Sequence, residues 1–170
     1  MNLDKIVAWC APWNHLFGHS KLIAGSVLGV HIMALFLGGG LAVAADRMTL
    51  RVPVGDVDRR RAQLREVSVV HPLVLVAIVL LFASGGLLAA ADVETFLPSP
   101  VFWTKLTLVT LLVVNGALLT RVEHRLTSLT GDQPPGVGDR EWARVRLFSI
   151  FSVLLWTATA VVGIVLSNIA

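Results

Sequence analysis

Five histidines and a single cysteine are the residues of this chain best suited to bind a metal or a cofactor. His31 stands out because it lies inside an uncharged apolar stretch that runs from Leu22 to Ala45. At about 1.5 Å per helical residue, that stretch is long enough to cross a hydrocarbon core roughly 30 Å thick. An ionisable side chain near the middle of a bilayer is costly, so its imidazole should face protein, water or a cofactor. We therefore predict that His31 contacts haem b or another tetrapyrrole, with Gly38 beside the ring.

Other interpretations of His31 stay open. A neutral imidazole could be hydrogen-bonded to Asn115, to a serine or to a backbone carbonyl, and copper or a proton path are further alternatives. The run Gly38-Gly39-Gly40 that follows costs roughly 1 kcal/mol of helix propensity per glycine relative to alanine. Such a run makes sense where something bulky lies against the backbone. That object could be a neighbouring helix or a flat ring.

His71 is a second candidate cofactor contact, with an interfacial cap as the alternative role, and it precedes Pro72 close to the start of another apolar stretch. Proline is tolerated in a first helical turn, so we expect His71 near the edge of the membrane. His31 and His71 would then differ in depth by roughly 10 Å. One haem bound by both would strain that geometry.

His15 and His19 are the candidate metal ligands. Their spacing of four residues lets two imidazoles share a helix face and hold one metal ion, although no carboxylate or thiolate stands at a defined spacing beside them. Together with Cys10 they form the basis of a copper-handling alternative. Solvated or headgroup-facing histidines are the simpler interpretation.

Composition places these residues in a membrane protein. Of the 170 residues, 55% are hydrophobic and only 15% are charged, and the mean hydropathy is +0.77. These values lie outside the range of soluble globular chains. We predict an all-α fold, an integral membrane four-helix bundle of one domain (1–170). An interfacial segment (1–20) should precede spans at about 22–45, 67–91, 101–120 and 147–169.

The connections between the spans should carry most of the charge. Asp46 and Arg47 are expected to end the first span and to begin a loop over 46–66, with a helical extension from Asp56 to Glu66. Lys105, early in the third span, could reach the interface or pair with an acid of the preceding turn. The loop over 121–146 has a linker-like centre, TGDQPPGVGD.

Small and polar residues are expected to mediate contacts between helices. Glycines at helical spacing let another helix approach closely, and an asparagine inside a span can hydrogen-bond a neighbouring helix. The residues predicted to have this role are Gly25, Gly29, Gly85, Gly86 and Asn115.

Charge asymmetry predicts the orientation. All but three of the 14 lysines and arginines lie in the two longer loops. The positive-inside rule then places these loops in the cytoplasm and both termini in the periplasm, which implies a bacterial inner membrane. The net charge of +3 therefore reflects orientation, and nucleic-acid binding is not expected.

The stretches HIMALFLGGGLAVAADRM and HPLVLVAIVLLFASGGLLAAADVETFLPSPVFWTKLTLVTLLVVNGALLTR resemble a family of uncharacterised bacterial four-helix membrane proteins, a domain of unknown function, over residues 22–120. The matching positions are His31, Gly38, Asp46, Arg47, Gly85, Lys105 and Asn115. The chain is more loosely similar to the membrane domain of the copper-resistance D family and to four-helix b-type cytochromes. These resemblances imply a four-helix membrane fold with a link to haem or copper. The cytochromes, however, use histidines on facing helices at matching depth, which this chain does not offer.

The favoured function is therefore a membrane-embedded redox or cofactor-binding protein, a haem carrier in electron transfer. One alternative is a non-catalytic accessory subunit that packs against a larger membrane complex or forms a homo-oligomer in the lipid bilayer. The other is the copper-handling protein. No nucleophile, base and orienting residue occur at a recognisable spacing, so hydrolysis or group transfer is not expected.

Overall fold

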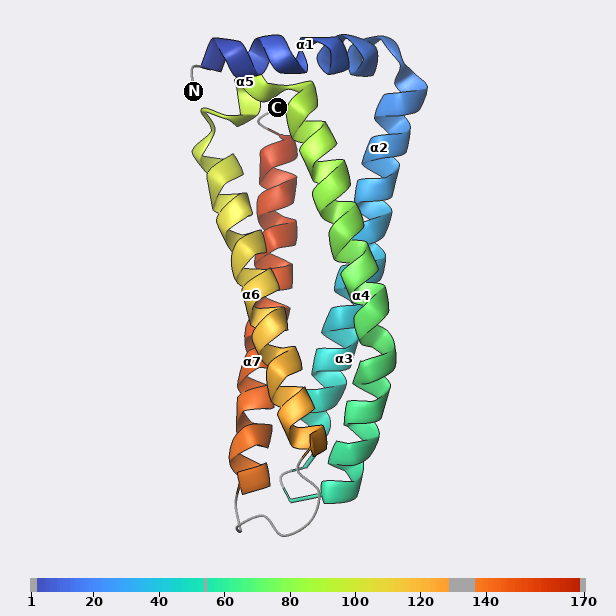
Figure 1. Ribbon diagram of the computed structural model, residues 1–170, viewed down its shortest axis with the longest axis vertical. Helices are drawn as coiled ribbons and strands as arrows, with labels where there is room; N and C mark the ends of the chain where they lie inside the picture. The colour runs from blue at the N-terminus through green and yellow to red at the C-terminus, as the bar shows by residue number, and fades with distance from the viewer. Residues whose placement is uncertain (1–2, 54, 129–136, 169–170) are drawn as a thin grey trace.

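The structure is a computed structural model that describes residues 3–53, 55–128 and 137–168. Helices make up its elements, and these ranges contain no strand. Four helical segments are long and apolar enough to cross a membrane: Lys21–Arg51, Val57–Ala91, Pro100–Leu126 and Gly138–Ser167. They run side by side as a bundle (Figure 1), which confirms the predicted all-α fold.

The helices follow one another with short connections. In chain order they are α1 (Leu3–His19), α2 (Lys21–Ala34), the π-helical turn η1 (Leu35–Gly39), α3 (Gly40–Arg51), α4 (Val57–Ala91), α5 (Val93–Phe96), α6 (Pro100–Ser128) and α7 (Val137–Ser167).

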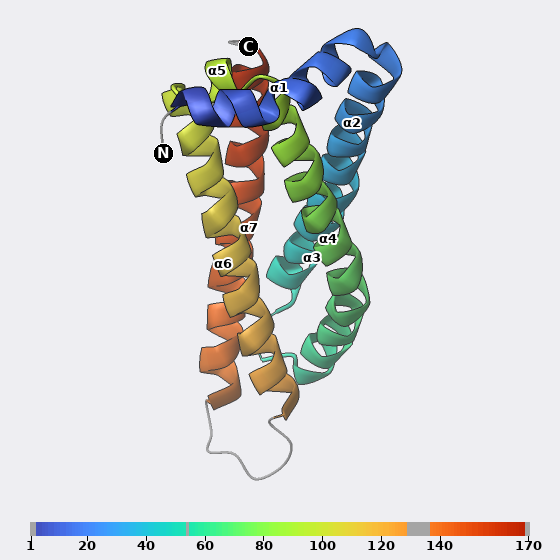
Figure 2. The same ribbon diagram turned by 45° about the horizontal axis from the view of Figure 1, so that its top comes forward.

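The N-terminal helix α1 lies across one end of the bundle, above α5 (Figures 1 and 2). Pro12 falls inside this helix without ending it. The indole Nε1 of Trp13 donates a hydrogen bond to the Leu87 carbonyl at 2.8 Å, and the Asn14 amide donates to the Ala91 carbonyl at 2.6 Å. These two bonds attach α1 to the last turns of α4. Trp9, 84% exposed, points away from the bundle, as expected for a segment at a membrane surface.

The first span is continuous from α2 through η1 to α3. Ser20 caps it, because its Oγ accepts a hydrogen bond from the backbone N–H of Ile23 at 3.3 Å. The helix continues to Arg51, so the prediction that a loop begins at Asp46 is wrong. Asp46 is buried among polar groups of the bundle and does not need water, so the chain does not have to leave the helix there.

The second long helix begins before the apolar stretch that it contains. Asp56 caps α4 by accepting a hydrogen bond from the Arg59 N–H at 3.0 Å, so the predicted helical extension over 56–66 is confirmed. His71 and Pro72 consequently lie inside α4, so the expectation that Pro72 stands in a first helical turn is wrong. The linker-like centre predicted for the loop over 121–146 lies largely outside the described residues.

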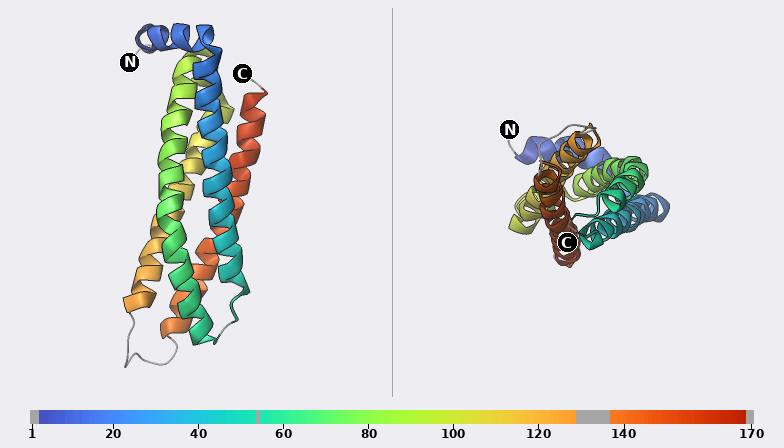
Figure 3. Two further views of the ribbon diagram at one scale, coloured as in Figure 1. Left: turned by 90° about the vertical axis from the view of Figure 1, so that its right-hand side faces the viewer. Right: turned by 90° about the horizontal axis from the view of Figure 1, so that it is seen from below.

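Two helical hairpins form the bundle. The first consists of the α2–α3 span and α4, which lie beside each other along their length (Figure 3), and the second consists of α6 and α7. The hairpins meet mainly where α3 packs on α7, whereas α4 and α6 touch little.

The hydrophobic core lies at the end of the bundle opposite α1. We call this end the arginine-rich end, because it carries the exposed arginines Arg59, Arg61, Arg65, Arg140 and Arg144. The buried members of the core come from α6, α7 and the α3–α4 connection, and they are Val52, Leu119, Val122, Trp142 and Val145. Trp142 and Val145 are fully buried. Burial of such side chains contributes about 1.5–3 kcal/mol each, so this end fixes how the hairpins are joined.

Arg60 strengthens the same end. Its guanidinium forms an ion pair with Asp139 at 2.7 Å and lies 5.5 Å from the ring centre of Trp142. Arg146 donates a hydrogen bond to the Val52 carbonyl at 3.2 Å. These contacts connect α7 to the connection after α3 and to the first turn of α4.

Candidate functional site

His31 is held on the inner side of the first hairpin by Ser84 of α4. Its Nδ1 lies 2.9 Å from the Ser84 Oγ, and Ser84 in turn donates its hydroxyl hydrogen to the Leu80 carbonyl at 2.5 Å. Because that hydrogen is already used, the Ser84 oxygen must accept from His31, and Nδ1 carries the imidazole hydrogen. The Leu81 carbonyl, which can only accept, also lies close to the ring. The neutral tautomer therefore leaves a lone pair on Nε2.

Gly85 of α4 leaves room for the His31 imidazole to lie against the helix backbone. A Cβ on Gly85 would lie 3.3 Å from the Cε1 of His31, which is tighter than ordinary contact. The predicted contact role of Gly85 is thus a close approach between α4 and the His31 ring. Ser84 is one of the partners expected for a neutral imidazole. Asn115, another expected partner, instead donates its amide hydrogen to the Phe148 carbonyl at 3.0 Å and joins α6 to α7.

Protein fills the space next to Gly38. A Cβ there would lie 2.5 Å from the Cβ of Ala77, and a Cβ on Gly39 would lie 3.0 Å from the Cε3 of Trp156. The bulky objects expected against this glycine run are therefore helix α4 and an indole ring. The π turn η1 coincides with this contact, as π turns often do where a helix adapts to a tight neighbour.

The other predicted packing glycines make no such contact. A Cβ on Gly25, Gly29 or Gly86 would meet nothing within 4 Å. No helix of this chain, as far as it is described, approaches them. These three positions are therefore open in the part of the chain that the structure describes.

Lys105 turns its ammonium towards α7. Its Nζ lies 3.4 Å from where a Cβ on Gly163 would be, and it is within electrostatic reach of His31. Within the described chain, no ion pair joins it to Asp92 or Glu94, because the side chain points into the bundle rather than to the turn. One helical turn from Gly163, the buried Thr159 hydroxyl has no hydrogen-bond partner among the described residues.

A second polar group of side chains surrounds His71. Its Nε2 lies 3.1 Å from the Thr120 Oγ1, and its Nδ1 lies 3.5 Å from the Glu123 Oε2. Thr120 donates its own hydrogen to the Gly116 carbonyl at 2.9 Å, so the hydroxyl oxygen accepts from Nε2–H. Both ring nitrogens of His71 are occupied by protein. His71 is therefore not placed as a free ligand beside His31.

Asp46 completes this group from α3. Its carboxyl group is 6% exposed, lies beside the Ser149 and Ser152 hydroxyls of α7, and is within electrostatic reach of Glu123. Within the ranges described, no ion pair connects Asp46 or Glu123 to a lysine or an arginine. The cluster lies between the helices, where solvent is scarce.

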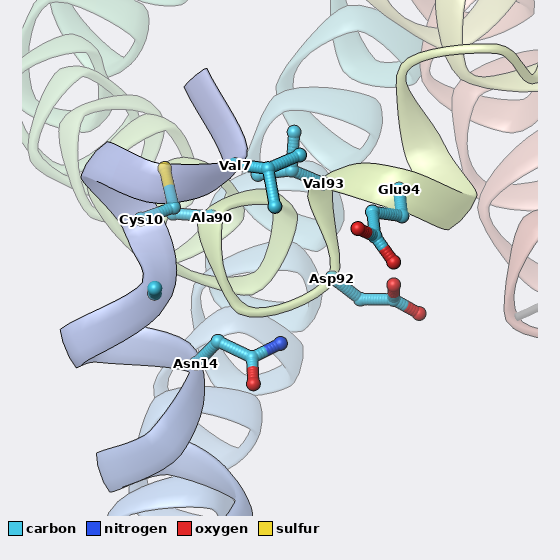
Figure 4. Close-up of a pocket in the computed structure, with 8 residues that line it drawn as sticks. Val7, Cys10, Asn14, Ala90, Asp92, Val93 and Glu94 are labelled. Carbon is cyan, nitrogen blue, oxygen red and sulfur yellow. The ribbon is translucent and has the colours of Figure 1, made fainter. Parts of the chain in front are cut away.

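The His15 and His19 rings stack on α1, with centroids 4.1 Å apart, and both residues are exposed. No three metal-binding side chains gather anywhere among the residues that the structure describes. Cys10 lies in a cavity of about 200 Å³ between α1 and α5 (Figure 4). There, Asp92 and Glu94 lie near each other, on the far side of the cavity from the Cys10 sulfur.

Sequence reasoning missed Asp46, Glu123, Ser149 and Trp156 as interior residues. Asp46 and Glu123 fall in the predicted loops, because a charge usually marks the end of a span. A usable signal was present: Leu119, Val122 and Leu126 continue a helical apolar spacing around Glu123.

Together, the fold and these groups define a multi-pass α-helical membrane protein with two polar clusters inside its bundle, one around His31 and one around His71. The sequence matches no protein-family model, no curated protein and no solved structure among those compared.

Proposed function

We propose that this chain is a cofactor-binding membrane protein in which the Nε2 of His31 ligates the metal of a haem-like ring and serves electron transfer. The observation that supports this proposal is the hydrogen bond between His31 Nδ1 and Ser84. Ligating histidines characteristically donate the other ring hydrogen to a fixed acceptor, which sets the tautomer and orients the ring. In this chain the acceptor is itself fixed, since Ser84 is 3% exposed and bonded to its own helix.

The surrounding residues limit how such a group would be held. His31 would provide one axial nitrogen, Gly85 would keep its imidazole in place, and Lys105 would offer a positive charge nearby. Gly38 would not touch the ring in this arrangement, because Ala77 and Trp156 cover it. Bound iron would supply a one-electron change. The role of the protein would be to orient the ligand and exclude water.

We further propose the predicted orientation, with the arginine-rich end in the cytoplasm of a bacterium and α1 at the periplasmic surface of the inner membrane. The support is the charge of the two ends. The exposed arginines Arg59, Arg61, Arg65, Arg140 and Arg144 all lie near the α3–α4 connection or the start of α7. Such clusters remain on the cytoplasmic side during insertion and suit anionic lipid headgroups.

Absorption spectroscopy tests the cofactor. The chain is produced in cells supplied with haem, purified in mild detergent, and measured in the oxidised and the reduced state. We expect a haem spectrum that changes on reduction and that is lost in His31→Gln. His15→Gln, an exposed histidine on α1, is the matched control and should keep the spectrum. A colourless wild-type protein, or a His31→Gln variant with the wild-type spectrum, would contradict the proposal.

A second candidate is the accessory subunit, favoured by the open glycines Gly25 and Gly29 on α2. Such small residues let another transmembrane helix approach closely, and no helix of the described chain uses them. Gly25→Leu combined with Gly29→Leu should then remove a stoichiometric partner that co-purifies with the wild-type chain. Purification of the wild-type protein as a lone monomer would exclude this candidate.

A further inference from the structure

Every membrane-spanning segment contributes to the polar cluster around His71. Asp46 comes from α3, His71 from α4, Thr120 and Glu123 from α6, and Ser149 and Ser152 from α7. We call these six residues the acid-histidine cluster. An isolated ionisable group inside a bundle would be costly, and groups that persist there are commonly functional.

Hydrogen-bond accounting determines how many protons the His71–Glu123 pair holds. Nε2–H of His71 is committed to Thr120, so Nδ1 faces the Glu123 carboxyl at 3.5 Å. Two lone pairs facing each other would repel, and the Val67 carbonyl beside the ring can only accept, so we place one proton on this pair. It resides either on Glu123, which then donates to neutral His71, or on Nδ1, which then faces a carboxylate. In both cases the pair is neutral overall and holds this one shared proton.

Asp46 is the charged member. The hydroxyls of Ser149 and Ser152 lie beside its carboxyl group and can donate to it. Ser149 is 1% exposed, and its Oγ forms no well-aligned hydrogen bond among the described residues, so its hydrogen is available to this carboxylate. Two neighbouring carboxyl groups in a place of low dielectric constant resist ionising together. If Asp46 is ionised and the His71–Glu123 pair holds its one shared proton, the cluster carries a single net negative charge.

We propose that the acid-histidine cluster is a proton-binding site that takes up one further proton from the arginine-rich end of the bundle. Uptake would protonate both members of the His71–Glu123 pair, so that an imidazolium and a carboxylic acid face the Asp46 carboxylate. The net charge of the cluster would change from negative to neutral. No covalent bond other than the new N–H or O–H forms, and the proton comes from water.

The groups around the cluster agree with this charge balance. α3 brings the Asp46 carboxylate, α4 brings His71, and α6 brings Glu123 and the exposed His124, which is within electrostatic reach of His71. α7 brings hydroxyls, and in the described chain no lysine or arginine is ion-paired with Asp46 or Glu123. The proposed route for protons between water and His71 passes through His124. The proposal is independent of whether His31 binds a cofactor.

Infrared difference spectroscopy of the full chain in lipid vesicles tests the site. Spectra recorded at acid and at alkaline pH should differ in a carboxylic-acid C=O band that shifts in deuterated water. This band appears on uptake where the shared proton had been on Nδ1, and it changes frequency where the proton had been on Glu123, because an imidazolium then faces the carboxylic acid. Glu123→Gln, which keeps the shape of the side chain, should remove that band. Glu66→Gln, an exposed acid on α4, should leave it. An unchanged band in Glu123→Gln, or a band that does not respond to pH, would overturn the proposal.

A second measurement tests the route. His124→Gln should slow proton uptake after a pH jump at least several-fold, followed with a pH-sensitive dye on the arginine-rich side, while leaving the final infrared spectrum unchanged. Uptake at the wild-type rate would overturn the role of His124.

If Glu123→Gln does not fold, Asp46→Asn replaces it in the infrared experiment. Its spectrum should also lose the band change, because the negative charge that favours the extra proton is gone. An unchanged band in Asp46→Asn would overturn the proposal.

Discussion

The Nδ1 of His71 lies 3.5 Å from the Oε2 of Glu123, and the two residues come from helices that otherwise touch little. This contact therefore joins the two hairpins through polar atoms where few apolar ones are available. The same pair that we propose to bind protons also contributes to the association of α4 with α6.

Removal of the His71 imidazole should destabilise the bundle. In His71→Ala, the Thr120 hydroxyl and the largely buried Glu123 carboxyl lose a partner. An unsatisfied buried polar group costs about 1–3 kcal/mol. Thermal unfolding in detergent, followed by circular dichroism, should show a lower midpoint for His71→Ala. His19→Ala, exposed on α1, should not differ from wild type, and equal midpoints for all three proteins would contradict the interpretation.

Gly38→Ala should force α2–α3 away from α4. The new methyl group would lie 2.5 Å from the Ala77 Cβ, a distance that requires the backbones to separate. Overpacking of this kind costs about 1–3 kcal/mol. The double variant Gly38→Ala with Ala77→Gly should recover most of the loss, because the methyl group merely changes helix. Gly25→Ala, with open space around it, is the control and should not lower the unfolding temperature.

Ser84→Ala should weaken cofactor binding more than it weakens the fold. The serine fixes the tautomer of His31, and loss of such a supporting partner typically costs about 10–100-fold in ligand affinity. Titration of the purified protein with haem, followed by absorption, measures the change. Ser68→Ala, an exposed serine of α4, should titrate as wild type does. Equal affinities for Ser84→Ala and wild type would argue against ligation through His31.

Asp139→Asn should loosen the arginine-rich end. Arg60 has a side chain only 8% exposed, and its charge would lose its partner at 2.7 Å. Because Asp139 itself is 60% exposed, we expect a loss on the order of 1–2 kcal/mol, less than for a fully buried pair. Arg60→Met, which removes the buried charge as well, should destabilise less than Asp139→Asn. The reverse order in a thermal unfolding comparison would show that Arg60 contributes mainly through Trp142.

The sequence was sufficient for the architecture because hydropathy over long windows is a direct consequence of what a bilayer tolerates. It was also sufficient to single out His31, since a histidine in an uncharged span is rare. It did not predict that Asp46 and Glu123 are buried in the bundle. A carboxylate in a sequence indicates the end of a span unless the hydroxyls that stabilise it are known. Ser149 and Ser152 are distant from Asp46 in sequence, and only the fold brings them together.

Gly38 shows a second limit of prediction from the sequence, which concerns what lies against a glycine. The glycine run correctly indicated a close approach, but composition cannot say whether a cofactor or a protein ring makes it. Trp156 lies more than a hundred residues further along the chain. Its contact with Gly39 depends on how the second hairpin is placed against the first.

The π-helical turn at Leu35–Gly39 determines the direction in which each later side chain of the first span points around the helix axis. Each residue of a helix advances the side chains by about 100° around the axis. Deletion of a single residue within this turn would therefore rotate Asp46 away from Ser149 and towards the lipid, while His31 would keep its place. The two interior polar clusters are thus separable by one deletion, without alteration of any side chain that belongs to either of them.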